Sequence, residues 1–490
     1  MNFRSAAMTG IAWSVSSQAV RMILQVVTTV VLARLLTPED FGVYAMAIPV
    51  IALATLFQDL GLQQALIQRE KITTAQINKV FWINFAVTLA IALLLVLISP
   101  LVSRFYGEER LTVLTSAWGI IMILGSLGFG QYALLGRAFR FRALAIIDMA
   151  CAIAAFVTVT VLAYFWPSYW ALWASGVASV ACWIVLSMVV SGWRPGLPQR
   201  GVDLDGIFGF GMNVTIHNVA NYASRNLDNI LIGRNFGALV LGHYDRAYKL
   251  LLYPLENIAG PISRVMVPIL SRMNGDPAQF RRAFLQASGI QSLICIPGMA
   301  VAIGCADELI RILLGEKWMA VAPIFYWLGF AGLIQPLIDS TGWLFFAQGR
   351  SKALMSMSVA TSIVTVAAFF IGLRWGAVGV ACAYAIVEYV YRVPLLFFLA
   401  GRRGSVTALD LILGVLPLLA AAGLTLLTIH FLREAQSLQG MRLIFAALPI
   451  AYGEALAVLA LLPTGRRLLV STFRLATDGM KMLRPAARQI

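Results

Sequence analysis

Polar side chains recur at helical spacing in three long apolar segments of this chain. In residues 11–36 they follow one another at intervals of three and four, which places on one helix face Ser14, Gln18, Arg21, Gln25 and Thr28. A second stripe, in residues 207–235, consists of Asn213, His217, Asn221, Ser224 and Asp228, with Arg225 at its margin. A third, in residues 240–270, consists of Asp245, Lys249, Glu256 and Ser263, beside Arg246.

These stripes must face away from lipid, since a single arginine at the middle of a membrane costs about 2.5–3.5 kcal/mol. Two interpretations are open. The stripes could join helices through paired side chains, such as Arg225 with Asp228 or Lys249 with Asp245. They could instead line a water-filled cavity. We favour the cavity, because the stripes continue over many helical turns, whereas joining two helices needs only one or two polar positions.

The sign of charge in this cavity indicates the class of substrate. Residues 11–36 contain no acid, so Arg21 has no carboxylate on its own stripe. A guanidinium without an acid is suited to phosphate or pyrophosphate, which it can bind with two parallel hydrogen bonds. The amides of Gln18 and Gln25 could bind carbohydrate. An exporter of cationic drugs would require an unpaired acid here instead.

The composition predicts an integral membrane protein. Of the 490 residues, 60% are hydrophobic and 12% charged, whereas soluble domains carry roughly 25% charged residues. The net charge of +15 fits cationic cytoplasmic loops beside anionic lipid better than it fits nucleic acid. The five cysteines form no C-x-x-C pair and the three histidines are scattered, so we expect no metal site and no cofactor.

The pattern of apolar segments predicts an all-α polytopic protein with about fourteen transmembrane helices of roughly 20 residues or more. We place them at 11–36, 41–62, 79–101, 111–135, 143–165, 168–191, 207–235, 240–270, 284–304, 318–347, 353–373, 376–400, 407–431 and 442–463. Lys and Arg are concentrated in alternate loops, which predicts that both termini are cytoplasmic. No sizeable extramembrane loop remains that could hold a catalytic domain.

Residues 31–47 and 231–247 repeat one another at an offset of 200 residues. Arg34, Gly42, Tyr44 and Ala47 match Arg234, Gly242, Tyr244 and Ala247. The repeat predicts two six-helix lobes, 1–200 and 201–403, related by a pseudo-two-fold axis along the membrane normal. Two further helices in 404–464 and a basic cytoplasmic tail, 465–490, complete the predicted organisation.

Four segments together resemble a known family: ARLLTPEDFGVYAMA (33–47), DLGLQQALIQ (59–68), NLDNILIGRNFGALVLGHYDRAYKLLLYPLENI (226–258) and VPILSR (267–272). They are similar to the polysaccharide transporters of the multidrug/oligosaccharidyl-lipid/polysaccharide exporter superfamily, in particular the group exporting colanic acid or succinoglycan repeat units. The resemblance implies a lipid-linked oligosaccharide flippase of the bacterial inner membrane, used in exopolysaccharide or lipopolysaccharide synthesis. It also implies alternating access by two rocking lobes and coupling to an ion or proton gradient.

The resemblance further implies arginines in the first and eighth helices of a cationic cavity, which match Arg21 and Arg246 or Lys249. Adding the polar stripes, we predict as substrate-binding residues Arg21, Gln18, Gln25, Asn221, Arg225, Asp228, Arg246 and Lys249. As coupling residues we predict Asp245, Glu256 and His217. The expected partners are undecaprenyl-pyrophosphate-linked oligosaccharide, membrane lipid, and polymerase and chain-length regulator proteins of the same pathway.

Two other functions stay open at this point. One is a multidrug antiporter of the same fold, which the missing acid in residues 11–36 disfavours. The other is a membrane-embedded polymerase or ligase, which the short loops disfavour. Among the remaining charges in the spans, Glu388 and Arg392 are four residues apart and form a predicted structural pair. Asp148 and Glu454 are lone acids and hence candidate proton carriers.

Overall fold

The computed structural model describes residues 22–59, 62, 66, 72–138, 140–198, 207–402, 404–435, 438–463, 465–470 and 472, and for residues 207–225 the course of the backbone alone. Throughout these ranges the regular structure is helical and contains no strand. Ten of the helices are long and apolar enough to cross a membrane. The predicted fold class, an all-α polytopic membrane protein, is confirmed.

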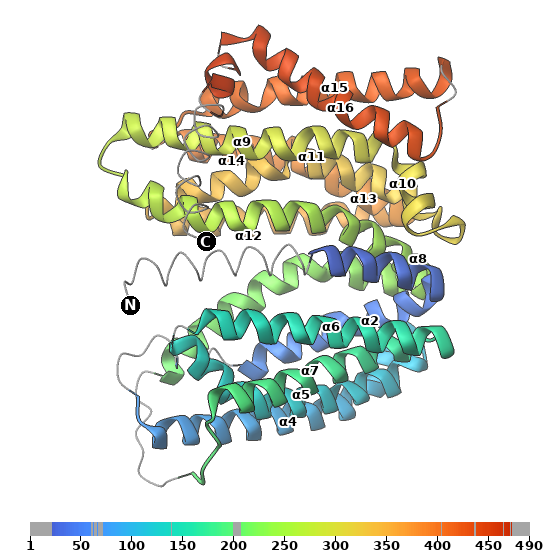
Figure 1. Ribbon diagram of the computed structural model, residues 1–490, viewed down its shortest axis with the longest axis vertical. Coiled ribbons are helices and arrows are strands. Elements are labelled where there is room, and N and C mark those ends of the chain that lie inside the picture. Colours follow the sequence, from blue (N-terminus) through green and yellow to red (C-terminus); the bar gives the residue numbers. More distant parts are fainter. Residues whose placement is uncertain are drawn as a thin grey trace, which may run out of the picture. The chain divides into compact units, whose positions relative to one another are not determined.

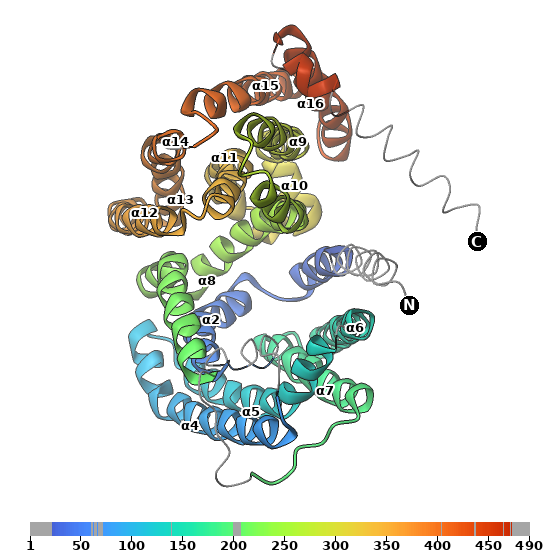
Figure 2. The same ribbon diagram turned by 90° about the vertical axis from the view of Figure 1, so that its left-hand side faces the viewer.

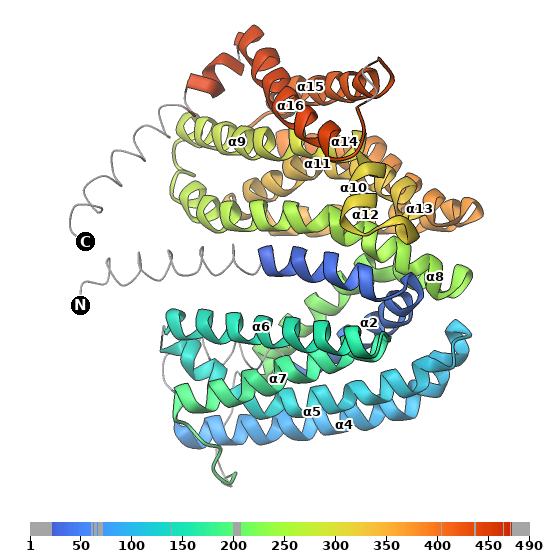
Figure 3. The same cartoon turned by 45° about the vertical axis from the view of Figure 1, so that its right-hand side comes forward.

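Contacts divide the chain into two units, of which the first is Met1–Asp245. After a helix at Met22–Leu35, it contains α2 (Pro38–Asp59), α4 (Thr74–Tyr106), α5 (Arg110–Arg137), α6 (Phe141–Phe165), α7 (Tyr169–Ser191) and the first part of α8 (Ile207–Arg272). Figures 1 and 3 show α4, α5 and α7 lying side by side within this unit.

The helices of the first unit begin and end where local side chains satisfy the backbone. Thr73 and Gln76 form a capping box at the start of α4, and Gly107 ends that helix with φ 70°. Ser168 caps α7 by accepting a hydrogen bond from the backbone N–H of Trp170. Such caps satisfy amide groups that have no partner inside the helix. The turns at Gly107 and Ser168 coincide with breaks predicted from the sequence.

The second unit, Arg246–Ile490, is helical as well (Figure 2). Beyond the rest of α8 it contains α9 (Pro277–Gly304), α10 (Ala306–Leu313), α11 (Val321–Ala347), α12 (Ser351–Gly372), α13 (Gly376–Val387), α14 (Val393–Gly401), α15 (Ala408–Ala435) and α16 (Met441–Leu461). A π-helical turn, Glu388–Arg392, connects α13 to α14, so that these pieces together form the predicted span at 376–400. Arg392 donates to Glu388 at 2.8 Å, which confirms the predicted pair.

One glycine divides the long helix α8 into two parts. Gly237 has φ 77° and ψ −178°, and the backbone is helical on either side of it. A side chain would strain this conformation, because residues other than glycine rarely adopt positive φ. The break separates 207–236 from 238–272, in agreement with the predicted spans at 207–235 and 240–270. With this division every predicted span has a helical counterpart among the described residues.

In each unit an arginine between two helices binds the carboxyl end of a third helix. In the first, Arg140, between α5 and α6, donates to the carbonyl oxygen of Val190 at the end of α7, at 2.9 Å. In the second, Arg350, between α11 and α12, donates to the carbonyl oxygens of Leu399 and Ala400 at the end of α14. Cations stabilise the carboxyl ends of helices. The arrangement is what two structural repeats would produce, although the lobe boundary at residues 200 and 201 stays a prediction.

Candidate functional site

The predicted substrate-binding residues differ in how far the structure describes them. Gln18 and Arg21 lie outside the described residues. The backbone of α8 passes through His217, Asn221 and Arg225, whose side chains are not described. Gln25 is exposed on the helix Met22–Leu35. The five remaining predicted residues lie on the two parts of α8. They are Asp228, Asp245, Arg246, Lys249 and Glu256.

Asp228 is held inside the first unit by two hydrogen bonds. Its side chain is 5% exposed. It accepts 2.9 Å from the hydroxyl of Tyr244 and 2.8 Å from the backbone N–H of Asn229. Asp228 precedes the break at Gly237 and Tyr244 follows it, so their bond connects the two parts of α8. A buried carboxylate needs such donors, because an unsatisfied one costs several kcal/mol.

Charged side chains continue into the second part of α8. Asp245 and Arg246 are 9% and 7% exposed, Lys249 is half-buried and Glu256 is exposed. Arg246 and Lys249 are three residues apart, so they lie on one face of the helix within one turn of each other. Two cations at this spacing are suited to an anionic ligand with several oxygens, such as a diphosphate.

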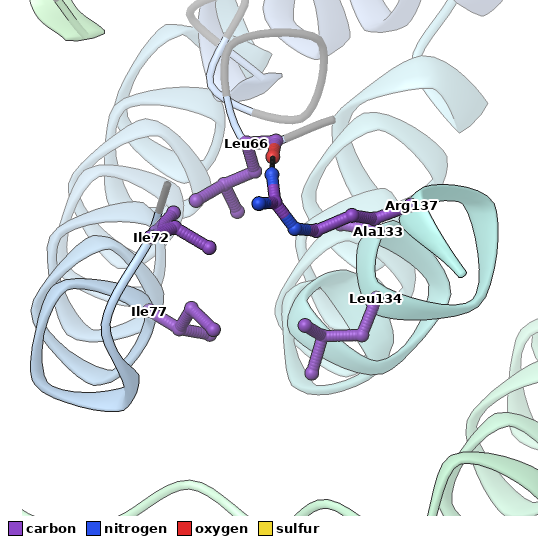
Figure 4. Close-up of a pocket in the computed structure, with 6 residues that line it drawn as sticks. All are labelled: Leu66, Ile72, Ile77, Ala133, Leu134 and Arg137. Carbon is purple, nitrogen blue, oxygen red and sulfur yellow. Dashed lines mark hydrogen bonds between the residues drawn. The ribbon is translucent and has the colours of Figure 1, made fainter. Parts of the chain in front are cut away.

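A hollow in the first unit is lined by none of these residues. It contains about 180 Å³ of empty space, partly open to solvent, between the start of α4 and the end of α5 (Figure 4). Its lining consists of Leu66, Ile72, Ile77, Ala133, Leu134 and Arg137. Arg137 donates to the carbonyl oxygen of Leu66 at 3.2 Å. The one charged group in the lining of the hollow is thus already hydrogen-bonded, and the walls are otherwise apolar. We therefore interpret the hollow as a packing gap.

Three other acids in the spans accept hydrogen bonds from neutral groups. Asp148 accepts from the hydroxyl of Tyr132 at 3.2 Å and Asp339 from the amide of Gln335 at 2.9 Å. Glu454 on α16 accepts from two hydroxyls of α15, those of Thr425 at 2.7 Å and Thr428 at 2.6 Å. Asp148 and Glu454 are among the predicted proton carriers, but their hydroxyl donors lie on other helices, and spacing along one helix does not show what a neighbouring helix presents.

Comparison with known proteins places the chain in a family. Residues 31–323 match the family model described as "Polysaccharide biosynthesis protein". The chain belongs to this family. It is 24% identical over 400 residues to the lipopolysaccharide biosynthesis protein WzxC of Escherichia coli (strain K12), covering 80% of each chain. It is 27% identical over 404 residues to the teichuronic acid biosynthesis protein TuaB of Bacillus subtilis (strain 168), covering 81% of each.

Solved structures show the fold of this family member. A lipid II flippase, MurJ, in an inward closed conformation is similar with a TM-score of 0.72 at 15% identity, over 91% of this chain and 98% of that one. An inward-facing multidrug transporter of the MATE family is similar with a TM-score of 0.58 at 14% identity, over 82% and 95%. The family and the fold together make this protein a multi-pass membrane protein of the polysaccharide biosynthesis family.

Proposed function

We propose that this protein is a flippase for undecaprenyl-pyrophosphate-linked oligosaccharide repeat units. It carries them from the cytoplasmic to the periplasmic leaflet of the bacterial inner membrane, for exopolysaccharide or lipopolysaccharide synthesis. Two lobes alternate in access to a cationic cavity, and an ion or proton gradient drives the cycle. Both termini face the cytoplasm, and the polymerase and chain-length regulator of the pathway act on the delivered product.

The observation that carries this proposal is the family match at residues 31–323 in a chain with a lipid-flippase-like fold. The succinoglycan transport protein ExoT of Rhizobium meliloti (strain 1021) supports it, being 26% identical over 330 residues and 66% of each chain. The buried cation of Arg246, with Lys249 one turn away, supports a diphosphate as the group that is bound.

Within the proposed cavity each residue has a definite task. Arg21 and Arg246 bind the diphosphate, because a guanidinium can donate two parallel hydrogen bonds to it. Gln18, Gln25 and Asn221 donate to and accept from sugar hydroxyls. Arg225 and Lys249 add positive charge, and Asp228 fixes the two parts of α8 through Tyr244. The residues that couple transport to the ion or proton gradient are among His217, Asp245 and Glu256.

Replacement of Arg21 by alanine tests this function. We expect Arg21→Ala to insert normally and to lower polymer output about ten- to a hundredfold, because a charge-assisted contact is worth about 1.5–3 kcal/mol. Lipid-linked repeat units should accumulate in the cytoplasmic leaflet. The measurements are polymer yield and accessibility of the lipid-linked pool to an impermeant oxidant in spheroplasts. Arg21→Lys should restore activity only in part, since an ammonium cannot form the same fork.

Arg272→Ala provides a matched control, because Arg272 is an exposed cation at the end of α8. It should leave polymer yield unchanged. Normal output from Arg21→Ala at wild-type protein levels would contradict the cavity assignment. If deletion of the protein changed drug tolerance while the lipid-linked pool stayed normal, a multidrug antiporter would be the function.

A further inference from the structure

Two glycines that correspond in the sequence repeat lie directly against each other. Gly42 is on α2 and Gly242 on the second part of α8. Both lie within the first unit, but they belong to different predicted lobes, 1–200 and 201–403. A Cβ atom at position 42 would overlap the carbonyl group of Ala238 and lie 2.9 Å from its Cα. A Cβ atom at position 242 would overlap the carbonyl oxygen of Pro38 and lie 3.1 Å from the backbone nitrogen of Gly42. We call this contact the glycine crossing.

The glycine crossing is reciprocal. Gly42 contacts Ala238, which is four residues before Gly242, and Gly242 contacts Pro38, which is four residues before Gly42. Adding 200 to 42 gives 242, and subtracting 200 from 238 gives 38, so the second pair is the first pair with the two repeats exchanged. A contact in which each side presents the same surface to the other is the property of a two-fold axis. The local axis that relates α2 to the second part of α8 therefore passes between these two glycines.

Backbone contact of this closeness depends on small residues. In membranes, helices approach most closely where small residues stand four apart, as at Ala238 and Gly242. Carbonyl oxygens against glycine Cα atoms also allow weak C–H···O bonds. Here the displaced atoms would be backbone atoms on both sides, so no rotation of a side chain could make room. Any side chain at position 42 or 242 must move the helices apart.

Neighbouring contacts hold the same ends of these helices together. A Cβ atom at Gly233 would be 3.0 Å from the ring of Tyr106 and 3.4 Å from Met46. The guanidinium of Arg234 lies 5.7 Å from the ring centre of Phe105. Arg110 pairs with Glu39 in the first turn of α2 and with Glu108, which lowers the pKa of the Glu108 carboxyl. All these residues are near helix ends that the distribution of Lys and Arg places outside.

We propose that the glycine crossing is the seal that closes the outer side of this transporter. The proposal rests on the alternating access of the proposed function. It assigns to Gly42 and Gly242 the task of letting the two repeats meet at their outer ends. When the transporter opens outward, this backbone contact must separate. A side chain at either position keeps the helices apart and favours the outward-open state.

The position of the contact along the helices distinguishes a seal from a pivot. Lobes that rock about the middle of the membrane move least there and most at their ends. Pro38 and Ala238 are the first residues of their helical segments, and the glycines are only one turn further in. With a rise of about 1.5 Å per residue, the crossing is about 6 Å from the helix ends. A contact there is broken by rocking, whereas a pivot would persist.

The rate at which a cysteine at position 46 reacts with a maleimide measures whether the seal is open. Met46 is 1% exposed and lies one turn below Gly42. Met46→Cys, in a background without the five native cysteines, should react slowly with an impermeant maleimide added to intact cells. Adding Gly42→Val or Gly242→Val should increase the rate of labelling at least tenfold. Labelling in inside-out vesicles should not increase, since only the outer side opens.

The matched control is Gly342→Val on α11, where an added Cβ would meet nothing within 4 Å. It should leave labelling of Met46→Cys unchanged. Gly42→Ala and Gly242→Ala provide milder variants, and their double variant should label little faster than either single one, because one methyl group already separates the crossing.

Unchanged labelling in correctly inserted variants would overturn the proposal, and so would equal increases from both sides of the membrane. Failure of the alanine variants to insert would overturn it as well, since the crossing would then serve folding. Failure of the proposed substrate would show only in the lipid-linked pool and not in this labelling, so the two ideas are tested separately.

Discussion

At the scale of single residues, the hydroxyl of Tyr244 shows how a buried acid is kept in place. It donates to Asp228 across the break at Gly237, and Tyr244 is itself only 1% exposed. The repeat marks Tyr244 as the counterpart of Tyr44, yet nothing in the sequence shows that it binds Asp228. The side-chain partner depends on how two helices meet, which the periodicity of one helix does not determine.

Removal of that hydroxyl should destabilise the protein. We expect Tyr244→Phe to lower the free energy of unfolding by about 1–3 kcal/mol, the cost of leaving a buried acceptor with one donor fewer. The measurement is titration of the purified protein with SDS in detergent micelles. Tyr164→Phe serves as the control, because Tyr164 is 70% exposed. A loss of equal size in the control would show that the hydrogen bond to Asp228 contributes nothing.

At the scale of elements, the apolar segments predicted the helices well, because length and turn residues determine where a membrane helix can begin and end. The predicted span at 143–165 corresponds to Phe141–Phe165, and that at 168–191 to Tyr169–Ser191. The π-helical turn at Glu388–Arg392 was not predicted. It changes the hydrogen-bond register without changing the composition, and such turns depend on packing against neighbouring helices.

The two arginines that bind helix ends give a prediction at this scale. Arg140→Met and Arg350→Met should each lower stability, because each removes a cation from carbonyl groups at a helix end. Arg350 contacts two carbonyl groups and Arg140 one, so the loss should be larger for Arg350→Met. Thermal unfolding of purified variants measures the effect. Arg374→Met, at an exposed arginine, is the matched control, and a larger loss there would contradict this interpretation.

At the scale of the whole molecule, the topology follows from where the cations are. The distribution of Lys and Arg among the loops predicts that the loop after α8 is cytoplasmic and the loop before α5 is periplasmic. We therefore expect Gly275→Cys to react with an impermeant maleimide only in inside-out vesicles, and Glu109→Cys in intact cells. Position 275 has open space around it, and Glu109 is exposed. The reverse pattern would invert the predicted orientation of both termini.

The predicted site is harder to derive from sequence than the fold. Spacing placed Asp228 and Asp245 on polar faces and Arg246 beside one, and the structure shows all three buried. Which faces meet depends on the arrangement of whole helices, since a substrate path is built from several elements at once. For Gln18 and Arg21, which lie outside the described residues, the cavity assignment stays a prediction.

The reciprocal contact of Gly42 and Gly242 also has a consequence for the origin of the chain. Because each partner presents the same backbone surface, a protein with one copy of the repeat could make this contact with a second, identical molecule. Joining two such copies in a single gene would leave the interface intact. Each position would thereafter constrain the other. A methyl group gained at position 42 or 242 could not be accommodated by a change of side-chain rotamer at the matching position.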